Sequence, residues 1–532
     1  MPVVGGKTAL DSEAIQDLVA AMLSQATYND AAASLTLTYP STPGAVGAAA
    51  IDGGNISVDP WRTALGLGDL AFLDSAPSST SNILDISQNS SGLNATVPTL
   101  RLLPVGTATN IDLVIAPKGA GAILAQIPDG GASGGDKRGL RSVDLQMERS
   151  GASKVTGNYA ALLAGINNGA TGLYSAAIAG RDSNASGDRS GIFVGQNHTA
   201  SGNGSAVVGG YGNTVAGTYS GVFEGSNNSV PAAKSGVFAG EYNTVNGDTN
   251  GIFASYGSTT SSAAAYGAIV GGSSNNVSAV SAGVFAGSSN TANANYAAVM
   301  GGLSNTASAL YAVAAGGQSN AVSGQHSGSL GGKSNIVSGQ YAGSLGGDTC
   351  TASGRNAATL GGELLIANAP YSLASGMQAT ARGLHGADVR AAGGFVSTGD
   401  AQRGIYIARC TTNGATPGTP VFNVSAPGTS NQLILPNYCS VSFRIQVTAR
   451  RVDAVNLESA SFEIVGLINR DYDATQITLL ASAKTIIYRP NTNWDINVSA
   501  NTTHGGLLIT ATGEAGKTIR WVCTIYTTEV GS

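Results

Sequence analysis

The side chains that could carry chemistry are few in this sequence and lie far apart. None of the histidines has a second metal-binding side chain at ligand spacing, and the cysteines form no paired metal motif. We therefore expect neither a metal nor a cofactor. A chain made in the cytosol keeps its thiols reduced, so no disulfide is expected. These residues are His198, His326, His385, His504, Cys350, Cys410, Cys439 and Cys523.

Two further patterns come closest to an active site, and neither completes one. Glu224 and Glu241 lie about one repeat apart, but glycoside hydrolysis needs a cleft that a thin coil scarcely provides. The GKS sequence at 332–334 resembles the end of a phosphate-binding loop, which also requires a glycine where Ser327 stands. The sequence therefore predicts that the protein is not an enzyme.

These isolated groups are set into a stretch, from Gly157 to about Arg382, that repeats itself every fifteen residues. The period slips once by two residues and then resumes. A period this short and regular is typical of a β-solenoid, in which each repeat forms one coil. The period is marked by Gly165, Gly180, Gly195, Gly210, Gly225, Gly240, Gly272, Gly287, Gly302, Gly317, Gly332, Gly347 and Gly362.

One repeat has room for two short strands and two tight corners. Corners require positive φ or side chains that bond to their own backbone, which explains the glycine, asparagine and serine. Apolar pairs such as Val222-Phe223 and Val237-Phe238 are expected to stack on those of the next coil. With coils about 4.8 Å apart, some fifteen coils make a rod roughly 70 Å long. So thin a core buries few side chains, and we expect that one rod is not stable alone.

The repeat GxxSxVFxGxxNxxS resembles the head repeats of trimeric autotransporter adhesins, and even more the repeats inserted in bacteriophage tail fibres. The resemblance covers the repeat region, which we delimit as residues 151–382. It implies a left-handed parallel β-roll within an elongated homotrimeric fibre. It does not imply a ligand, because the same scaffold hosts different functions.

The regions before the roll resemble the virion-proximal parts of such fibres. Residues 1–80 contain a predicted helix at 11–25, and WRTALGLG at 61–68 resembles a junction common in phage tail fibres. Residues 81–150 read as a β-rich shaft and linker, in which NIDLVIAPKGAGAI again resembles a fibre shaft. The helix is expected either to pack on its own domain or to join three chains or dock onto the virion, through Ile15, Leu18, Val19 and Met22.

After the roll the fifteen-residue repeat ends and the sequence pattern changes. Residues 383–404 form a transition, and 405–532 show alternating apolar residues and regularly spaced turns that predict a β-sandwich tip. ARRVDAVNLESASFEI and TGEAGKTIRWVCTIYTTEV resemble the closing domain of phage tail fibres. Exposed loops with aromatic and charged side chains suit sugar or protein surfaces. The candidate receptor-binding residues are Asp471, Tyr472, Asp473, Tyr488 and Arg489.

Composition and charge exclude several classes of partner and location. The net charge is −5 and lysine and arginine are scattered, which argues against nucleic acid. There is no apolar run long enough to span a membrane, and the N-terminus does not have the pattern of a secretory signal peptide. Together with these observations, the resemblance to phage tail fibres implies a virion tail protein assembled in the host cytoplasm.

The function favoured by these observations is a phage tail fibre that recognises a bacterial surface receptor. The expected partners are two further copies of the chain, tail or baseplate proteins at the N-terminal region, and a host surface glycan or outer-membrane protein at the tip. The alternatives are a bacterial trimeric adhesin, a depolymerising tailspike, and a capsid or tail decoration fibre without a receptor role.

Overall fold

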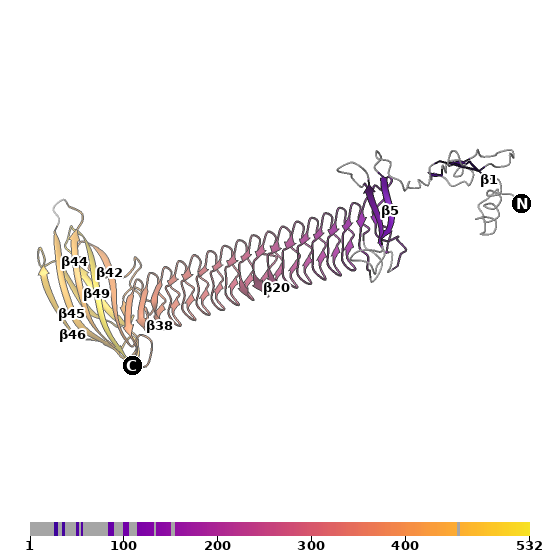
Figure 1. Ribbon diagram of the computed structural model, residues 1–532. Coiled ribbons are helices and arrows are strands. Elements are labelled where there is room, and N and C mark those ends of the chain that lie inside the picture. Colours follow the sequence, from indigo (N-terminus) through magenta and orange to yellow (C-terminus); the bar gives the residue numbers. More distant parts are fainter. Residues whose placement is uncertain are drawn as a thin grey trace. The chain divides into compact units, whose positions relative to one another are not determined.

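The chain divides into two compact units, Met1–Ala116 and Pro117–Ser532. The structure is a computed structural model. It describes residues 26–29, 34–37, 49–52, 55–56, 83–89, 99–105, 114–131, 135–149, 155–454 and 458–532 (Figure 1). Within these residues there is no α-helix, and consequently none long and apolar enough to cross a membrane.

The described residues of the N-terminal unit form two small antiparallel sheets. One has the order β1 (Ala26–Asn29), β2 (Ser34–Leu37), β3 (Ala49–Asp52) and β4 (Asn55–Ile56), and the other pairs β5 (Ile83–Asn89) with β6 (Thr99–Val105). The predicted helix at 11–25, with Ile15, Leu18, Val19 and Met22, lies outside the described residues. Its role in attachment stays a prediction.

The C-terminal unit begins with a parallel β-solenoid, which confirms the mainly β fold class predicted from the repeat (Figure 1). Most coils contribute a two-residue strand to each of two parallel ladders, and paired residues are fifteen apart, as in Val207 opposite Val222. The predicted two-residue slip is one longer coil, in which Gly251 pairs with Ala268. That the coils form a left-handed roll of the adhesin type stays a prediction.

Parallel pairing starts before the repeat region and continues past it. The first ladder consists of β7 (Ile123–Leu124), β8 (Val143–Asp144), β9 (Ala161–Leu162), β11 (Ala176–Ala177), β13 (Gly191–Ile192), β15 (Ala206–Val207), β17 (Gly221–Val222), β19 (Gly236–Val237), β22 (Gly251–Ile252), β25 (Ala268–Ile269), β28 (Gly283–Val284), β30 (Ala298–Val299), β32 (Val313–Ala314), β34 (Gly328–Ser329), β36 (Gly343–Ser344), β38 (Ala358–Glu363), β40 (Leu373–Met377) and β41 (Asp388–Ala392).

The second ladder consists of β10 (Gly169–Ala170), β12 (Asn184–Ala185), β14 (Thr199–Ala200), β16 (Thr214–Val215), β18 (Ser229–Val230), β21 (Thr244–Val245), β24 (Thr259–Thr260), β27 (Asn276–Val277), β29 (Thr291–Ala292), β31 (Thr306–Ala307), β33 (Ala321–Val322), β35 (Ile336–Val337), β37 (Thr351–Ala352) and β39 (Ile366–Ala367). A short third ladder joins β20 (Gly240–Glu241), β23 (Ser255–Tyr256) and β26 (Gly272–Ser273).

The interior of the solenoid takes one side chain from each strand. Val222 of the first ladder and Val230 of the second are fully buried, whereas Phe223 is 52% exposed. The prediction that the apolar pairs stack from coil to coil is confirmed, since Phe238 stacks on Phe223 and Phe253, but the phenylalanines stack on the outside of the coil. Consecutive residues of a strand face opposite sides, so only the first of the pair points inward.

A column of buried asparagines closes one corner of the coils. Asn228 accepts the backbone N–H of Asn243 (3.0 Å) and donates its amide to the carbonyl of Gly240 (2.8 Å). The side chain thus satisfies backbone groups that the corner would otherwise leave unpaired. The column contains Asn213, Asn228, Asn243, Asn275, Asn290, Asn305, Asn320 and Asn335.

The glycine at the same corner leaves no room for a side chain. Gly302 has a φ of +89°, and a Cβ there would lie 2.1 Å from the carbonyl oxygen of Gly317 on the next coil. Both the backbone conformation and the close approach of the coils therefore require glycine.

His198 takes the place of an asparagine in this column. Its side chain is buried, and Nδ1 accepts the backbone N–H of Asn213 (3.2 Å), so this nitrogen carries no proton. Burial lowers the pKa of the imidazole below its ordinary value of 6.5. The folded state therefore resists protonation of this residue.

We expect the free energy of unfolding to fall as the pH drops below about 6.5, because the unfolded chain then binds a proton that folded His198 resists. Above that pH the stability is fully present. The variant His198→Asn, which restores the asparagine column, should lose this part of the pH dependence. Melting temperatures of both proteins at about pH 5 and pH 8 test the expectation. His385, whose pKa burial also lowers, is common to both proteins. An equal fall in both would contradict the assignment.

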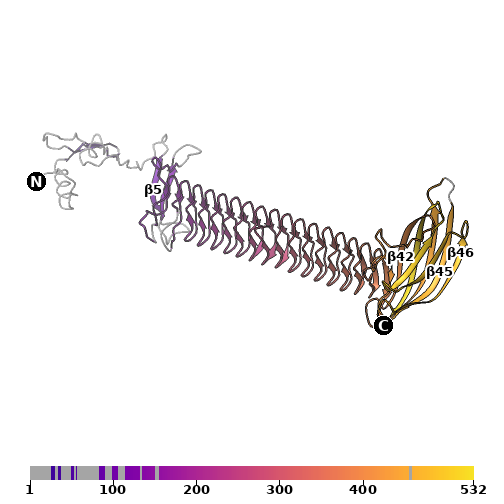
Figure 2. The same cartoon turned by 180° about the vertical axis from the view of Figure 1, so that it is seen from behind.

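The first ladder passes without a break into a five-stranded antiparallel sheet, the tip sheet (Figure 2). Its order is β42 (Ala401–Asn413), β49 (Thr518–Gly531), β44 (Cys439–Arg451), β45 (Ser459–Arg470) and β46 (Ile477–Tyr488). A three-stranded sheet has the order β43 (Leu433–Ile434), β48 (Gly506–Thr512) and β47 (Asp495–Asn501). The predicted alternation is confirmed in β44, where Val441, Phe443, Ile445 and Val447 are buried.

The two sheets of the tip share one core. Trp494 and Trp521 are fully buried in it, with ring centroids 6.1 Å apart. The same core takes in Cys350 and Leu365 from the last coils of the solenoid. The core of the tip therefore begins in the last coils of the solenoid.

Candidate functional sites

The residues predicted to bind a receptor lie at opposite ends of one β-hairpin. Asp471, Tyr472 and Asp473 connect β45 to β46 at the end of the tip sheet next to the solenoid. Tyr488 and Arg489 lie at the far end, which is roughly 35–40 Å away along a strand of this length. The structure therefore does not bring these two groups into one site.

The polar members of both groups are partly engaged within the tip. Asp473 accepts the hydroxyl of Thr475 (2.6 Å), and this bond holds the pKa of Asp473 below its usual range. Arg489 lies 3.8 Å from Asp495, which also pairs with Lys484 at 2.6 Å. The two tyrosines are more than half exposed. The two tyrosine rings, rather than the charged groups of Asp473 and Arg489, are therefore available to contact a receptor.

A polar network at the far end of the tip was missed by the sequence reasoning. Glu514 accepts hydrogen bonds from Asn491 (2.8 Å) and from the indole of Trp494 (2.9 Å), and it pairs with Lys517 (2.7 Å). The bond from Asn491, with that from Lys517, lowers the pKa of Glu514 to about 2. The network fixes the loops that follow β46 and β48. Its only sequence signal is the turn TGEAGKT, which carries opposite charges on the two sides of Gly516.

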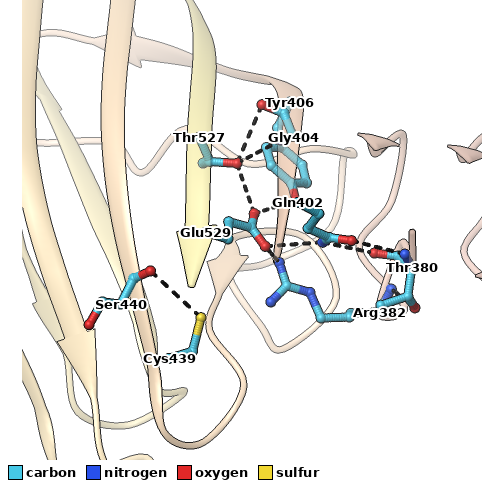
Figure 3. Close-up of polar contacts among 9 residues, drawn as sticks. All are labelled: Thr380, Arg382, Gln402, Gly404, Tyr406, Cys439, Ser440, Thr527 and Glu529. Carbon is cyan, nitrogen blue, oxygen red and sulfur yellow. Dashed lines mark hydrogen bonds and ion pairs between the residues drawn. The ribbon is translucent and has the colours of Figure 1, made fainter. Parts of the chain in front are cut away.

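A buried charge cluster joins the tip to the last coil of the solenoid (Figure 3). Glu529 of β49 is 1% exposed and pairs with Arg382. Its carboxylate also accepts bonds from Gln402 (3.0 Å), Thr527 (2.8 Å) and Tyr406 (3.3 Å). Burial, with the nearby carboxylate, raises the pKa of the Tyr406 hydroxyl.

This cluster is built for cohesion rather than for acid–base chemistry. Gln402 also exchanges two bonds with the backbone of Thr380, at 2.9 and 3.1 Å. With Arg382, Gln402, Thr527 and Tyr406 as partners, the carboxylate of Glu529 is fully hydrogen-bonded. Through Gln402 and Arg382 the cluster connects β42 and β49 to the solenoid. An ion pair closes the other end of the solenoid as well, where buried Asp144 pairs with Arg138 (2.5 Å) and Arg149 (2.6 Å).

Two grooves open on the outer face of the tip sheet. The first, of about 750 Å³, lies next to the solenoid and is lined by Arg390, Arg403, Phe395, Met377 and Val530 among others. The second, of about 540 Å³, lies toward the far end and is lined by residues that include Arg409, Arg520, Asn423 and Val424. Each groove combines two arginines with exposed apolar side chains.

An exposed apolar column runs along the first ladder of the solenoid. The outward residue of most of its strands is glycine or alanine, and in most coils a large apolar residue follows the buried one. The second ladder instead turns threonine, serine or asparagine outward in most coils. Apolar faces of this extent are rare on single chains and mark contact with another surface. The apolar column contains Leu163, Ile178, Phe193, Phe223, Phe238, Phe253, Val270, Phe285, Met300, Leu330, Leu345 and Leu360, which are 37–62% exposed.

A second exposed column consists mainly of tyrosines at the corner before the first ladder. The rings of Tyr296, Tyr311, His326 and Tyr341 stack on one another, with centroids 4.9, 4.8 and 5.2 Å apart. Because each ring covers its neighbour, the column shows ring edges and hydroxyls rather than flat faces. It therefore stabilises the coils and does not offer a platform on which a sugar ring could stack.

The residues proposed from the sequence for chemistry stay apart. Glu241 pairs with Ser226 on the preceding coil, so Glu224 is two residues out of register with it. Within the described ranges, no three histidine, cysteine or acidic side chains converge on a point that could hold a metal ion. The four cysteines are free thiols.

The C-terminal unit is thus a parallel solenoid continuous with an antiparallel tip. Comparisons with known families and with curated proteins give no match. Among solved structures, the chain is similar to the tailspike gp49 of the Acinetobacter baumannii bacteriophage Fri1, a capsular polysaccharide depolymerase. The identity is 9% over 77% of this chain and 72% of that one, with a TM-score of 0.20.

Two further tailspikes are similar in the same way. That of the Acinetobacter phage vB_ApiP_P1 is 10% identical over 74% of this chain and 82% of its own, with a TM-score of 0.16. That of the A. baumannii phage AM24 is 8% identical over 97% and 96%, with a TM-score of 0.18. At these identities and TM-scores the likeness assigns neither a substrate nor a residue role to this chain.

The prediction that the protein is not an enzyme is corrected. It rested on the thinness of the coils, which leave no cleft. A structure to which the chain is similar is described as a capsular polysaccharide depolymerase, and the two grooves described above lie on the tip. The thinness of the coils therefore does not exclude catalysis.

Proposed function

We propose that this protein is a fibre of a bacteriophage tail that binds a bacterial surface receptor through its tip. The observation that carries the proposal is the change from repeating coils to an antiparallel domain that holds both grooves. Repeating coils suit a spacer, whereas non-repeating loops on a rigid scaffold are where binding residues usually lie. The resemblance of the repeats to those of phage tail fibres supports the same function.

The fibre is a homotrimer in this proposal. The apolar column and the neighbouring small residues make the outer side of the first ladder an apolar face, and removing this face from water favours association. Large side chains of one copy would fit the column of glycines and alanines on the next, and a cyclic arrangement of three copies closes such a contact. Residues 1–80 would bind other tail or baseplate proteins.

The receptor is a glycan or an outer-membrane protein of the host, and three tips on one fibre would add avidity. Binding of labelled proteins to a panel of bacterial strains tests the assignment. A fragment with the tip must begin before Cys350, because the core of the tip starts there. We expect the full chain and residues 340–532 to label the same strains.

The complementary fragment, residues 1–339, is the control for the solenoid. It should label no strain that the tip fragment labels. If residues 1–339 bind cells as well as the full chain does, the solenoid is the binding part and the assignment to the tip fails.

A further inference from the structure

The outer face of the tip sheet is strongly basic, although the whole chain has a net charge of −5. Side chains alternate between the faces of a strand, so the strand registers define which residues face outward. Of the acidic residues on β41, β42, β49, β44, β45 and β46, only Asp388 and Glu463 share this face. The basic residues on it are Arg390, Arg403, Arg409, Arg444, Arg450 and Arg520.

Four of these arginines lie at the two ends of a track along β42 and β49. Arg390 is paired in register with Arg403 in the groove next to the solenoid. Arg409 and Arg520 line the groove toward the far end. Arg403 and Arg409 are six residues apart on one strand, which is about 20 Å. The track therefore has the length of several sugar units rather than of a single small molecule.

Most of these guanidinium groups have no partner within the tip. Arg444 pairs with Glu463. For the other five, no ion pair or side-chain hydrogen bond occurs among the residues that the structure describes. Like charges gathered on one face repel one another, so an anion bound there would relieve the repulsion. A second copy of the same face would add to it, which distinguishes this face from the apolar column of the solenoid.

We propose that this face, the arginine track, binds an extended polysaccharide that carries a carboxylate or a phosphate in its repeating unit. The proposal rests on the receptor-binding function and adds the class of ligand. Arginine forks match carboxylates and phosphates in two parallel bonds. Exposed Ile407 and Tyr526 between the grooves offer apolar contact to sugar rings, and Thr411 and Thr528 offer hydroxyls. The exposed aromatic rings along the described track are Tyr526 of β49 and Phe395 in the groove next to the solenoid, which are too few to stack a run of nucleic-acid bases.

The test uses polygalacturonate as the anionic probe and dextran as the neutral one, with the full-length protein. We expect binding to polygalacturonate alone, and weaker binding at higher salt because exposed charges are screened. The double variant Arg403→Gln/Arg409→Gln should bind roughly tenfold more weakly or worse, since each charge-assisted contact contributes a factor of several. The matched control is Arg189→Gln/Arg355→Gln, which removes two exposed arginines from corners of the solenoid and should bind like the unsubstituted protein.

Several results would overturn the proposal. Equal binding by the double variant and the unsubstituted protein would do so, as would equal binding to dextran. Tighter binding to single-stranded DNA at the same salt would assign the face to nucleic acid. A changed oligomeric state in the double variant would place the face between copies of the chain.

Binding to bacterial cells separates this proposal from the proposed function. If the unsubstituted protein and the double variant label the same strains equally, receptor binding is supported and the arginine track is contradicted. If the unsubstituted protein labels no strain, but it binds polygalacturonate and the double variant does not, the arginine track is supported and the receptor-binding function is contradicted.

Discussion

Replacing Arg382 with methionine is expected to destabilise the tip by about 3–5 kcal/mol, because it leaves a buried carboxylate without its counter-charge. Glu529 has a fully buried side chain, and its hydrogen bonds from Gln402, Thr527 and Tyr406 do not supply a positive charge. Methionine keeps the apolar length of the arginine but not its guanidinium. The loss should therefore exceed that of an ordinary surface substitution severalfold.

Tryptophan fluorescence during denaturation measures this effect locally. Two of the three tryptophans, Trp494 and Trp521, are fully buried in the core of the tip. The double variant Arg382→Met/Glu529→Gln removes both charges and should recover part of the lost stability, since the two residues act as one unit. If the double variant is no more stable than Arg382→Met, the guanidinium acts through packing and not through charge.

The solenoid was predictable because its signals are local and repeated. Glycine at every period marks a corner that Gly302 shows to have no room for a Cβ. Each coil repeats the contacts of the coil before it, so the fifteen-residue period is sufficient to predict the solenoid. The sequence did not predict that Phe223 points outward, because an apolar residue on an exposed face has the same sequence pattern as a core residue.

The tip resisted prediction because its contacts join distant parts of the chain. Alternation in β44 revealed a half-buried strand, but Arg382 and Glu529 are 147 residues apart and neither has a local signal. The arginine track was hidden for the same reason. Arg390, Arg409 and Arg520 look scattered along the chain, and only the pairing of β41, β42 and β49 brings them to one face.

The variant Phe238→Glu is expected to prevent assembly of the trimer while leaving the coil folded. Phe238 is 50% exposed and stacks between Phe223 and Phe253, with centroids 4.8 Å from each. In a lone chain, a glutamate at such an exposed position can keep its charge in water. In a trimer that buries the apolar column, three carboxylates would lose their hydration, at a cost of several kcal/mol each.

Sedimentation of the native protein measures the assembly. The unsubstituted chain should sediment at three times its mass of 52.7 kDa, and Phe238→Glu at the mass of a single chain. The matched control is Thr244→Glu, which places the same charge on the outward side of the second ladder in the adjoining part of the coil. It should remain trimeric, because that ladder turns polar residues to solvent. A trimeric Phe238→Glu with an unchanged circular dichroism spectrum would show that the apolar column lies outside the contact between copies. Equal dissociation of the two variants would show that added charge, rather than its position on the coil, weakens the assembly.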